Sequence, residues 1–233
     1  MNTLTEYLEH KDTFTVDDML RFYSKDTLPI SRKTVNWRIH NFTQKGVIQR
    51  VGRGLYRLGQ SNPFKLDVSP KMKKIAHFLK KEYPYTDFCV WELSVINQFS
   101  HYLINFNILF VDVERDALDS VYHKLKEKNT HVFNIRKTDE DLAELSNSIC
   151  VRPLISHAPL QMIDEIPVAS LEKILVDLYT DKEFFPFQGN EIDAIYESAF
   201  ERYTLNENTM LRYASRKEKK QKVQELLETI KRQ

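Results

Sequence analysis

Four acidic residues lie where two apolar segments end, and their chemistry suits a metal ion. Asp87 and Glu92 flank one segment. Asp112 and Glu114 lie at the end of the next one. Carboxylates gathered in this way can hold a divalent cation that activates water against a phosphodiester. Arg115 stands where such sites usually have lysine, and strand-end carboxylates are common on protein surfaces. A metal-dependent nuclease is therefore an alternative, but we expect no catalytic residue and no metal site.

The histidines and cysteines add no catalytic pattern. The seven histidines lack the His-Glu-x-x-His motif, and no two of them are four residues apart. Cys89 and Cys150 lie far apart among apolar residues, which predicts two reduced, buried thiols. The glycine pattern at residues 54–61 also has Gln60 where a P-loop requires lysine. We therefore expect no cofactor.

Basic residues are concentrated in one stretch of a balanced chain. The 233 residues include 34 Lys and Arg against 33 Asp and Glu, which gives a net charge of +1. Residues 27–60, however, contain seven basic residues and no acidic one. The balanced total excludes a protein that is basic throughout, whereas the local excess predicts an anionic partner for this stretch.

Residues 1–60 have the apolar spacing of three short helices. Thr15, followed three residues later by Asp18, is typical of the start of the second helix. Ser31 is placed to cap a third helix that ends near Lys45. These signals predict a compact helical unit at the N-terminus.

A short hairpin is predicted after the third helix. Two alternating segments are separated by residues 52–54, which contain two glycines. Three helices followed by a basic hairpin form a winged helix-turn-helix. Because residues 59–63 are rich in chain-breaking types, we expect this DNA-binding domain to span residues 1–60 and a second domain to span 61–233.

A winged helix-turn-helix places its third helix in the major groove of DNA. Arg32 and Asn36 have side chains that match base edges, and Arg53 at the hairpin tip is placed to reach the backbone or the minor groove. Trp37 is either a DNA contact or a packing residue. Winged helices also serve as protein-interaction modules. The predicted DNA contacts are Ser31, Arg32, Lys33, Asn36, Trp37, Arg38, His40, Lys45, Arg50 and Arg53.

Residues 61–233 alternate between strand-like and helical patterns. The predicted strands are residues 88–91, 108–113, 131–135 and 149–152. A helix is predicted over residues 70–81, and the chain from Ser170 onward has helical spacing. Ser215 and Glu218 are typical of the start of a last helix. We therefore expect a mixed α/β domain with a helical C-terminal part.

Apolar runs in this chain are too short to form a membrane span, since the longest have four residues. The first residues lack the basic and apolar regions of a signal peptide. We expect a cytoplasmic protein that does not bind membranes.

Three stretches resemble the AbiEi-type antitoxins. Two of them, ISRKTVNWRI at residues 30–39 and GVIQRVGRGLY at residues 46–56, look like the N-terminal domain of that family. The third, IPVASLEKILVDL at residues 166–178, is similar to the segment that follows its α/β core. The order of the parts agrees over most of the chain.

The resemblance implies a function. Members of that family are antitoxins of bacterial type IV toxin-antitoxin pairs, which are linked to abortive infection by phage. Their winged helix binds inverted repeats upstream of their own operon, and their C-terminal domain counteracts a nucleotidyltransferase-like toxin, which need not involve direct contact. We therefore expect an autorepressing, DNA-binding antitoxin that is not an enzyme. A nuclease and a ligand-responsive repressor remain the alternatives.

Overall fold

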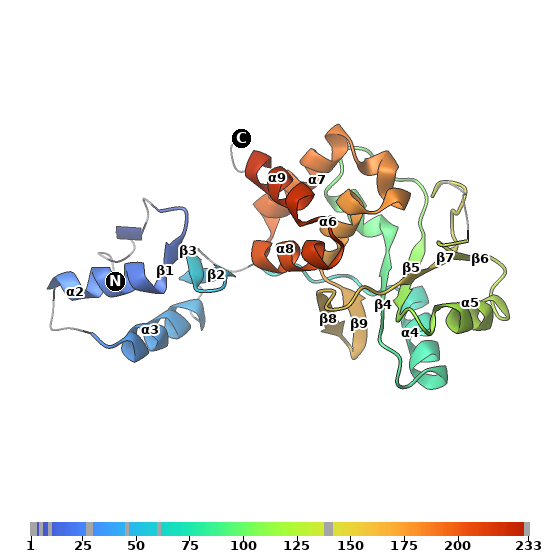
Figure 1. Cartoon of the computed structure of the whole chain (residues 1–233), viewed down its shortest axis with the longest axis horizontal. Helices are drawn as coiled ribbons and strands as arrows, with labels where there is room; N and C mark the ends of the chain where they lie inside the picture. The colour runs from blue at the N-terminus through green and yellow to red at the C-terminus, as the bar shows by residue number, and fades with distance from the viewer. Residues whose placement is uncertain are drawn as a thin grey trace. The chain divides into compact units, whose positions relative to one another are not determined.

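The structure is a computed structural model that describes residues 4, 7–8, 11–26, 30–44, 47–59, 62–137 and 142–230. It divides the chain into two compact units (Figure 1). The first contains residues 1–64 and 202–209, and the second contains residues 65–201 and 210–233. Helices and strands are mixed in the described parts, which confirms the predicted α/β class.

The first unit packs two helices against a small antiparallel sheet. Helices α2 (Val16–Asp26) and α3 (Arg32–Gln44) follow each other in the chain. Strands β1 (Phe14–Thr15), β2 (Ile48–Gly52) and β3 (Leu55–Leu58) pair in the order β1-β3-β2. The predicted second helix, third helix and hairpin are therefore all present.

Short polar interactions explain where the two helices begin. The backbone N–H of Thr15 donates to Asp18 Oδ2 at 2.8 Å, and the Asp18 N–H donates to Thr15 Oγ1 at 3.2 Å. This reciprocal pair is the predicted capping box. The Thr34 N–H donates to Ser31 Oγ at 3.2 Å, so Ser31 caps α3 as predicted. Between β2 and β3, Gly54 has a φ of 71°, a conformation that glycine adopts without steric penalty.

The core of the first unit lies between α2, α3 and the sheet. Val35 and Ile39 of α3 are buried, and Phe42 is partly buried. The other buried residues of this core are Leu4, Leu8, Phe14, Met19 and Ile48. The opposite face of α3 is consequently left for solvent or a partner.

Residues 202–209 belong to the first unit although they lie far along the chain. The Asn62 N–H donates to Thr204 Oγ1 at 3.0 Å, and the Thr204 N–H donates to the Asn62 carbonyl at 2.9 Å. The ring of Phe64 packs edge-on against Tyr203, with 5.1 Å between centroids. The first unit therefore includes a distant segment as well as residues beyond the predicted boundary at 60.

The second unit is built on a six-stranded mixed sheet in the order β6-β7-β5-β4-β9-β8. Its strands are β4 (Phe88–Glu92), β5 (Leu109–Val113), β6 (Val132–Asn134), β7 (Ile149–Pro153), β8 (Leu160–Ile163) and β9 (Ile166–Ala169). Strands β5, β6 and β7 are parallel, and β4 runs antiparallel to β5. The four predicted strands are present, whereas β8 and β9 were not predicted.

Helices cover both faces of this sheet. The elements are α4 (Pro70–Glu82), η1 (Leu93–Gln98), α5 (Leu118–Lys126), α6 (Leu171–Thr180), η2 (Lys182–Phe187), α7 (Asn190–Arg202), α8 (Glu207–Arg216) and α9 (Lys220–Ile230). Within the second unit, α4 and α5 lie on one side of the sheet, and α6 and α9 on the other (Figure 1). Because it is covered on both faces, β5 is buried over its whole length.

The start of the last helix differs from the prediction. Ser215 lies in the last turn of α8, and α9 begins only at Lys220. Glu218 has a φ of 60°, so the chain changes direction between the two helices. The predicted cap is wrong because Ser215 still has helical neighbours on its N-terminal side.

Among the residues that the structure describes, no helix is long and apolar enough to cross a membrane.

Candidate functional site

Five of the predicted DNA contacts lie on the exposed side of α3. Arg32, Lys33, Asn36, Trp37 and His40 are all exposed. They share one side because helical positions recur every three to four residues. Trp37 has 63% of its surface exposed, which rules out a packing role in the core of the first unit. This face combines positive charge, an amide and an aromatic ring.

Arg32 already has an acidic partner on this surface. Its Nη1 donates to Asp17 Oδ1 of α2 at 3.0 Å, and both side chains are exposed. Exposed ion pairs of this kind contribute only about 0–1 kcal/mol. A phosphate or a base edge can therefore compete with Asp17 for the guanidinium.

Two of the predicted contacts have structural roles. Ser31 caps α3, and its hydroxyl also lies 2.9 Å from Thr34 Oγ1. Arg38 is partly buried, with its guanidinium carbon 4.2 Å from the centre of the Tyr23 ring of α2. Arg38 therefore packs on α2 and lies apart from the exposed side of α3.

The predicted contacts of the hairpin are divided between two positions. Arg50 is exposed, and its Nε donates to the Gly52 carbonyl at 3.0 Å. Arg53 is exposed in the turn between β2 and β3. Lys45 lies outside the described residues. Arg53 is thus the hairpin cation best placed to meet an extended polyanion.

The four acidic residues singled out by the sequence do not form one site. Asp87 and Glu114 are exposed, whereas Asp112 is completely buried. Within the described ranges, no three His, Cys, Asp or Glu side chains are arranged to hold a metal ion. Asp112 was expected at a strand edge, but it lies inside the sheet, where Asp112 of β5 is the register partner of Arg152 of β7. The nuclease alternative therefore gains no support from Asp112.

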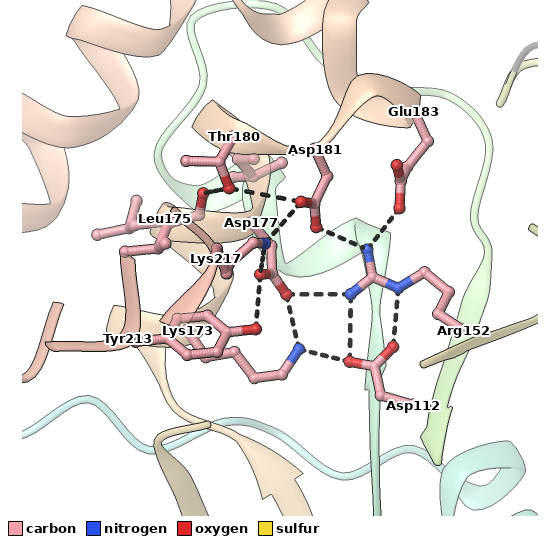
Figure 2. A network of polar contacts seen from close by, with 12 residues as sticks. Asp112, Arg152, Lys173, Leu175, Asp177, Thr180, Asp181, Glu183, Tyr213 and Lys217 are labelled. Carbon is pink, nitrogen blue, oxygen red and sulfur yellow. Dashed lines mark hydrogen bonds and ion pairs between the residues drawn. The ribbon is translucent and has the colours of Figure 1, made fainter. Parts of the chain in front are cut away.

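Asp112 instead belongs to a buried group of charged residues in the second unit (Figure 2). We call this group the charge cluster. Its members are Asp112, Arg152, Lys173, Asp177, Asp181, Glu183 and Lys217. They come from β5, β7, α6, η2 and the residues that directly follow α6 and α8. Four carboxylates thus face three cations.

Arg152 makes the most contacts in the charge cluster. Its Nε and Nη2 donate to the two oxygens of Asp112 at 2.8 and 3.2 Å. Nη2 also donates to Asp177 Oδ2 at 3.0 Å, and Nη1 donates to Glu183 Oε1 at 2.9 Å. The guanidinium carbon also lies 4.9 to 5.6 Å from the ring centres of Trp91, Phe110 and Phe184. Such a bidentate, stacked arrangement suits arginine and not lysine.

Asp177 is the most heavily bonded carboxylate. It accepts hydrogen bonds from Lys173 Nζ at 2.6 Å, Lys217 Nζ at 2.5 Å and the Tyr213 hydroxyl at 2.9 Å, in addition to Arg152. Burial alone would raise the pKa of the Asp177 carboxyl. The cations, led by Lys173, outweigh burial and hold that pKa far below its usual value. Asp177 is therefore ionised at every ordinary pH.

Asp181 is the carboxylate of the charge cluster whose pKa is raised. Lys217 Nζ lies 2.6 Å from its Oδ1, but Arg152 Nη1 lies 3.5 Å from its Oδ2. Burial and the nearby Asp177 raise the pKa of the Asp181 carboxyl to about 6. The surplus negative charge of the cluster thus falls on Asp181.

Strand register and helical spacing bring members of the charge cluster together. Because Asp112 and Arg152 are register partners in neighbouring strands, their side chains leave the sheet on the same face. Lys173 and Asp177 are four residues apart on α6, which places them together on one side of that helix. Ser170 fixes the start of α6 by accepting a hydrogen bond from the Lys173 N–H at 3.4 Å.

Sequence reasoning missed every member of the charge cluster except Asp112. The signal that was present is a charged residue inside an otherwise apolar element. Arg152 lies in the buried strand β7, and Lys173 and Asp177 lie in α6, whose other buried residues are almost all aliphatic. Buried charges are rare unless they are paired.

A pocket of about 360 Å³ opens beside the charge cluster. The members of the charge cluster that line it are Arg152, Asp177, Asp181, Glu183 and Lys217. Asp112 and Lys173 do not reach it, so the pocket exposes only one side of the cluster. Ligand pockets commonly combine a few convergent polar groups with apolar walls, and this one has both.

Residues 34–233 match the model of DUF6577, described as a family of unknown function. No curated protein matches the chain. The family match begins inside α3 and includes the β2–β3 hairpin and the entire second unit. The chain therefore belongs to the family of unknown function DUF6577.

Proposed function

We propose that the protein is a cytoplasmic, DNA-binding antitoxin that represses its own operon, with no catalytic activity of its own. The observation that carries the DNA-binding part is the exposed side of α3. Arg32, Lys33, Asn36, Trp37 and His40 are all exposed there. Phosphate contacts by cations, together with base contacts by Arg and Asn, are what DNA recognition requires.

The connectivity of the first unit supports the same proposal. Its elements follow in the order β1, α2, α3, β2 and β3, and the three strands form one antiparallel sheet. We interpret this arrangement as a winged helix-turn-helix, with α3 as the recognition helix and the β2–β3 hairpin as the wing. In that interpretation Arg53 in the hairpin turn contacts the DNA backbone.

Alanine at Arg32 or Asn36 is expected to reduce sequence discrimination by about 1–3 kcal/mol, because each substitution removes a base-edge contact. The measurement is a fluorescence-anisotropy titration of the full chain with two DNA duplexes. One duplex contains the inverted repeats upstream of the chain's own reading frame, and the other is a scrambled duplex of the same length.

Three further variants make the DNA experiment specific. Arg53→Ala is expected to weaken binding to both duplexes alike. It should also lower the slope of log affinity against log salt concentration by about one unit. Asp17→Asn frees Arg32 from its ion pair and is expected to strengthen binding. Lys81→Ala, an exposed residue of the second unit, is the matched control and leaves binding unchanged. Equal affinity of the unmodified protein for the two duplexes would contradict the proposal.

The antitoxin part of the proposal rests on the resemblance to AbiEi-type antitoxins. The stretch at residues 166–178 that carries this resemblance forms β9 and most of α6, and contributes Lys173 and Asp177 to the charge cluster. We place the antitoxin activity in the second unit. The partner we propose is a nucleotidyltransferase-like toxin encoded beside this chain, with neutralisation that need not involve direct contact.

Growth rescue separates the two parts of the proposed function. Cells that express the adjacent nucleotidyltransferase-like toxin are expected to grow when this chain is co-expressed from an unrelated promoter. Arg32→Ala in the same chain is expected to rescue equally well, since it alters only DNA binding. If growth is not restored by the unmodified chain at matched expression levels, the antitoxin role is wrong, and the DNA-binding role is judged by its own titration.

A further inference from the structure

Both carboxylates and cations of the charge cluster line the pocket, but the carboxylates are the more exposed. The side chains of Asp181 and Glu183 are 23% and 12% exposed, whereas those of Arg152 and Lys217 are 4% and 8% exposed. Four carboxylates share three cations, so one negative charge is uncompensated within the cluster. The side of the pocket beside Asp181 and Glu183 is therefore suited to a positively charged group.

The second oxygen of Glu183 strengthens this conclusion. Oε1 accepts a hydrogen bond from Arg152 Nη1 at 2.9 Å. In the described part of the chain, Glu183 Oε2 has no hydrogen-bond partner. An ammonium group carries three donors. It can therefore bond to Glu183 Oε2 and to Asp181 Oδ2, which lies 3.5 Å from Arg152 Nη1 and so is only weakly engaged.

The rest of the pocket carries the opposite charge. Arg136 and Lys182 line it, and both are exposed. Neither side chain forms an ion pair with any residue that the structure describes. These two cations would repel a simple metal ion or a diamine, but they can bind a carboxylate or another small anionic group.

An apolar wall completes the pocket. It is formed by Ile135, Pro153 and Ile155. This wall offers a contact for a short aliphatic chain, and a volume of about 360 Å³ is ample for a molecule of amino-acid size. Acidic, basic and apolar groups thus surround one small space.

We propose that this pocket binds a small zwitterion of the aliphatic amino-acid class. Its ammonium group lies against Asp181 and Glu183, its carboxylate lies against Arg136 and Lys182, and its side chain packs on Ile135, Pro153 and Ile155. This proposal goes beyond the DNA-binding antitoxin and does not depend on it, because every group involved belongs to the second unit.

Titration of Asp181 supports the placement of the ammonium group. The pKa of the Asp181 carboxyl is raised to about 6 by burial and by Asp177, against the opposing effect of Lys217 and Arg152, with Glu183 nearby. An ammonium group in the pocket favours the ionised carboxylate. Binding should therefore release protons near pH 6 and become weaker at pH 5 than at pH 7.5.

Isothermal titration calorimetry of the full chain tests the proposal with three matched probes. Leucine has all three recognition groups, 3-methylbutylamine lacks the carboxylate, and 4-methylpentanoate lacks the ammonium group. Leucine is expected to bind about tenfold or more tightly than either analogue, since each lost charged contact removes about 1.4 kcal/mol or more. Alanine, valine and isoleucine extend the series in side-chain size.

Variants assign the two ends of the ligand. The double variant Arg136→Gln with Lys182→Gln is expected to bind leucine about tenfold more weakly. It should bind 3-methylbutylamine at least as tightly as the unmodified protein does, because two repelling cations are removed. Glu183→Gln keeps an oxygen that can accept the hydrogen bond from Arg152. It is expected to weaken the binding of both leucine and 3-methylbutylamine. Lys81→Gln is the matched control and changes neither, and circular dichroism checks that each variant is folded.

The calorimetric outcomes decide the proposal. If 3-methylbutylamine binds as tightly as leucine, the proposed carboxylate subsite is wrong. If 4-methylpentanoate binds as tightly as leucine, the proposed ammonium subsite is wrong. If none of the four aliphatic amino acids binds at millimolar concentration, the zwitterion proposal is wrong. DNA binding measured on the same preparation shows separately whether the first unit is active.

Discussion

Replacing Asp177 by asparagine is expected to reduce the stability of the second unit by about 3–5 kcal/mol, as is typical when one partner of a buried ion pair is removed. Asp177 accepts hydrogen bonds from Lys173, Arg152, Lys217 and the Tyr213 hydroxyl. The asparagine amide has almost the same shape, so the loss would come from charge and not from packing.

The large effect follows from what Asp177→Asn leaves behind. Lys173 and Arg152 are almost fully buried, and each would then have to share the remaining carboxylates. The new amide group also has two N–H donors, one of which would point toward cations that are donors themselves. Unpaired charge in a buried site is much more costly than the loss of a pair at the surface.

Urea unfolding measures this effect. The two tryptophans lie in different units, since Trp37 is on α3 and Trp91 is on β4. With Trp37 changed to Phe, the fluorescence of Trp91 reports the second unit alone. The matched control is Asp164→Asn, whose exposed side chain pairs with Lys73 at 3.5 Å and should contribute about 0–1 kcal/mol. A loss below 1 kcal/mol for Asp177→Asn would show that the charge cluster does not stabilise the fold.

The elements defined by local pattern could be predicted from the sequence. Thr15 and Ser31 mark the starts of α2 and α3 because caps act within three residues of the chain. The β2–β3 hairpin is predicted from glycine in its turn, and Gly54 has the positive φ that such a turn requires. Both Cys89 and Cys150 are buried, as their apolar neighbours indicate.

Strands β8 and β9 were missed because their turn lacks the usual residues. Asp164 and Glu165 connect the two strands with φ values of 47° and 63°, positions where glycine or asparagine would be expected. Their conformation is supported from outside the hairpin, since Lys73 pairs with Asp164 and Lys80 donates to the Glu165 carbonyl at 2.5 Å. Contacts with a distant helix cannot be derived from a local pattern.

The charge cluster was missed because its members, too, come from distant parts of the sequence. Asp112 and Arg152 are 40 residues apart in sequence, and Lys217 is 40 residues from Asp177. Each is an ordinary charged residue until the order of the strands is known. A charge inside an apolar segment indicates that a partner exists, but only the sheet topology identifies it.

The second large effect is the dependence of stability on pH. Asp181 is expected to make the second unit less stable as pH rises, whereas buried carboxylates with lowered pKa values do the opposite. The Asp181 carboxyl has a pKa raised from 3.8 to about 6 by burial and by Asp177, so the native state keeps a proton that the unfolded chain loses between about pH 4 and 6. The unfolded state binds fewer protons in this range, and stability therefore decreases as pH rises through it. A shift of two units corresponds to about 3 kcal/mol.

Asp112 and Asp177 act in the other direction. Burial opposes ionisation of both, but Arg152 and Lys173 outweigh burial and lower the pKa of each carboxyl. Below about pH 4 the unfolded chain takes up protons that the native state does not, and stability decreases with acidification. The second unit should therefore be most stable near pH 4 to 5 with respect to these three residues.

Asp181→Asn isolates the contribution of Asp181 from that of the other carboxylates. The amide cannot ionise, so the variant should match the unmodified protein at pH 4 and be more stable by about 2–3 kcal/mol at pH 7.5. Urea unfolding at five pH values between 4 and 8 gives the difference curve, with Asp164→Asn as the control that stays flat. A curve that is also flat for Asp181→Asn would mean that Lys217 and Arg152 fully compensate this carboxylate. The charge cluster would then have no surplus charge for the ammonium group of a ligand to neutralise.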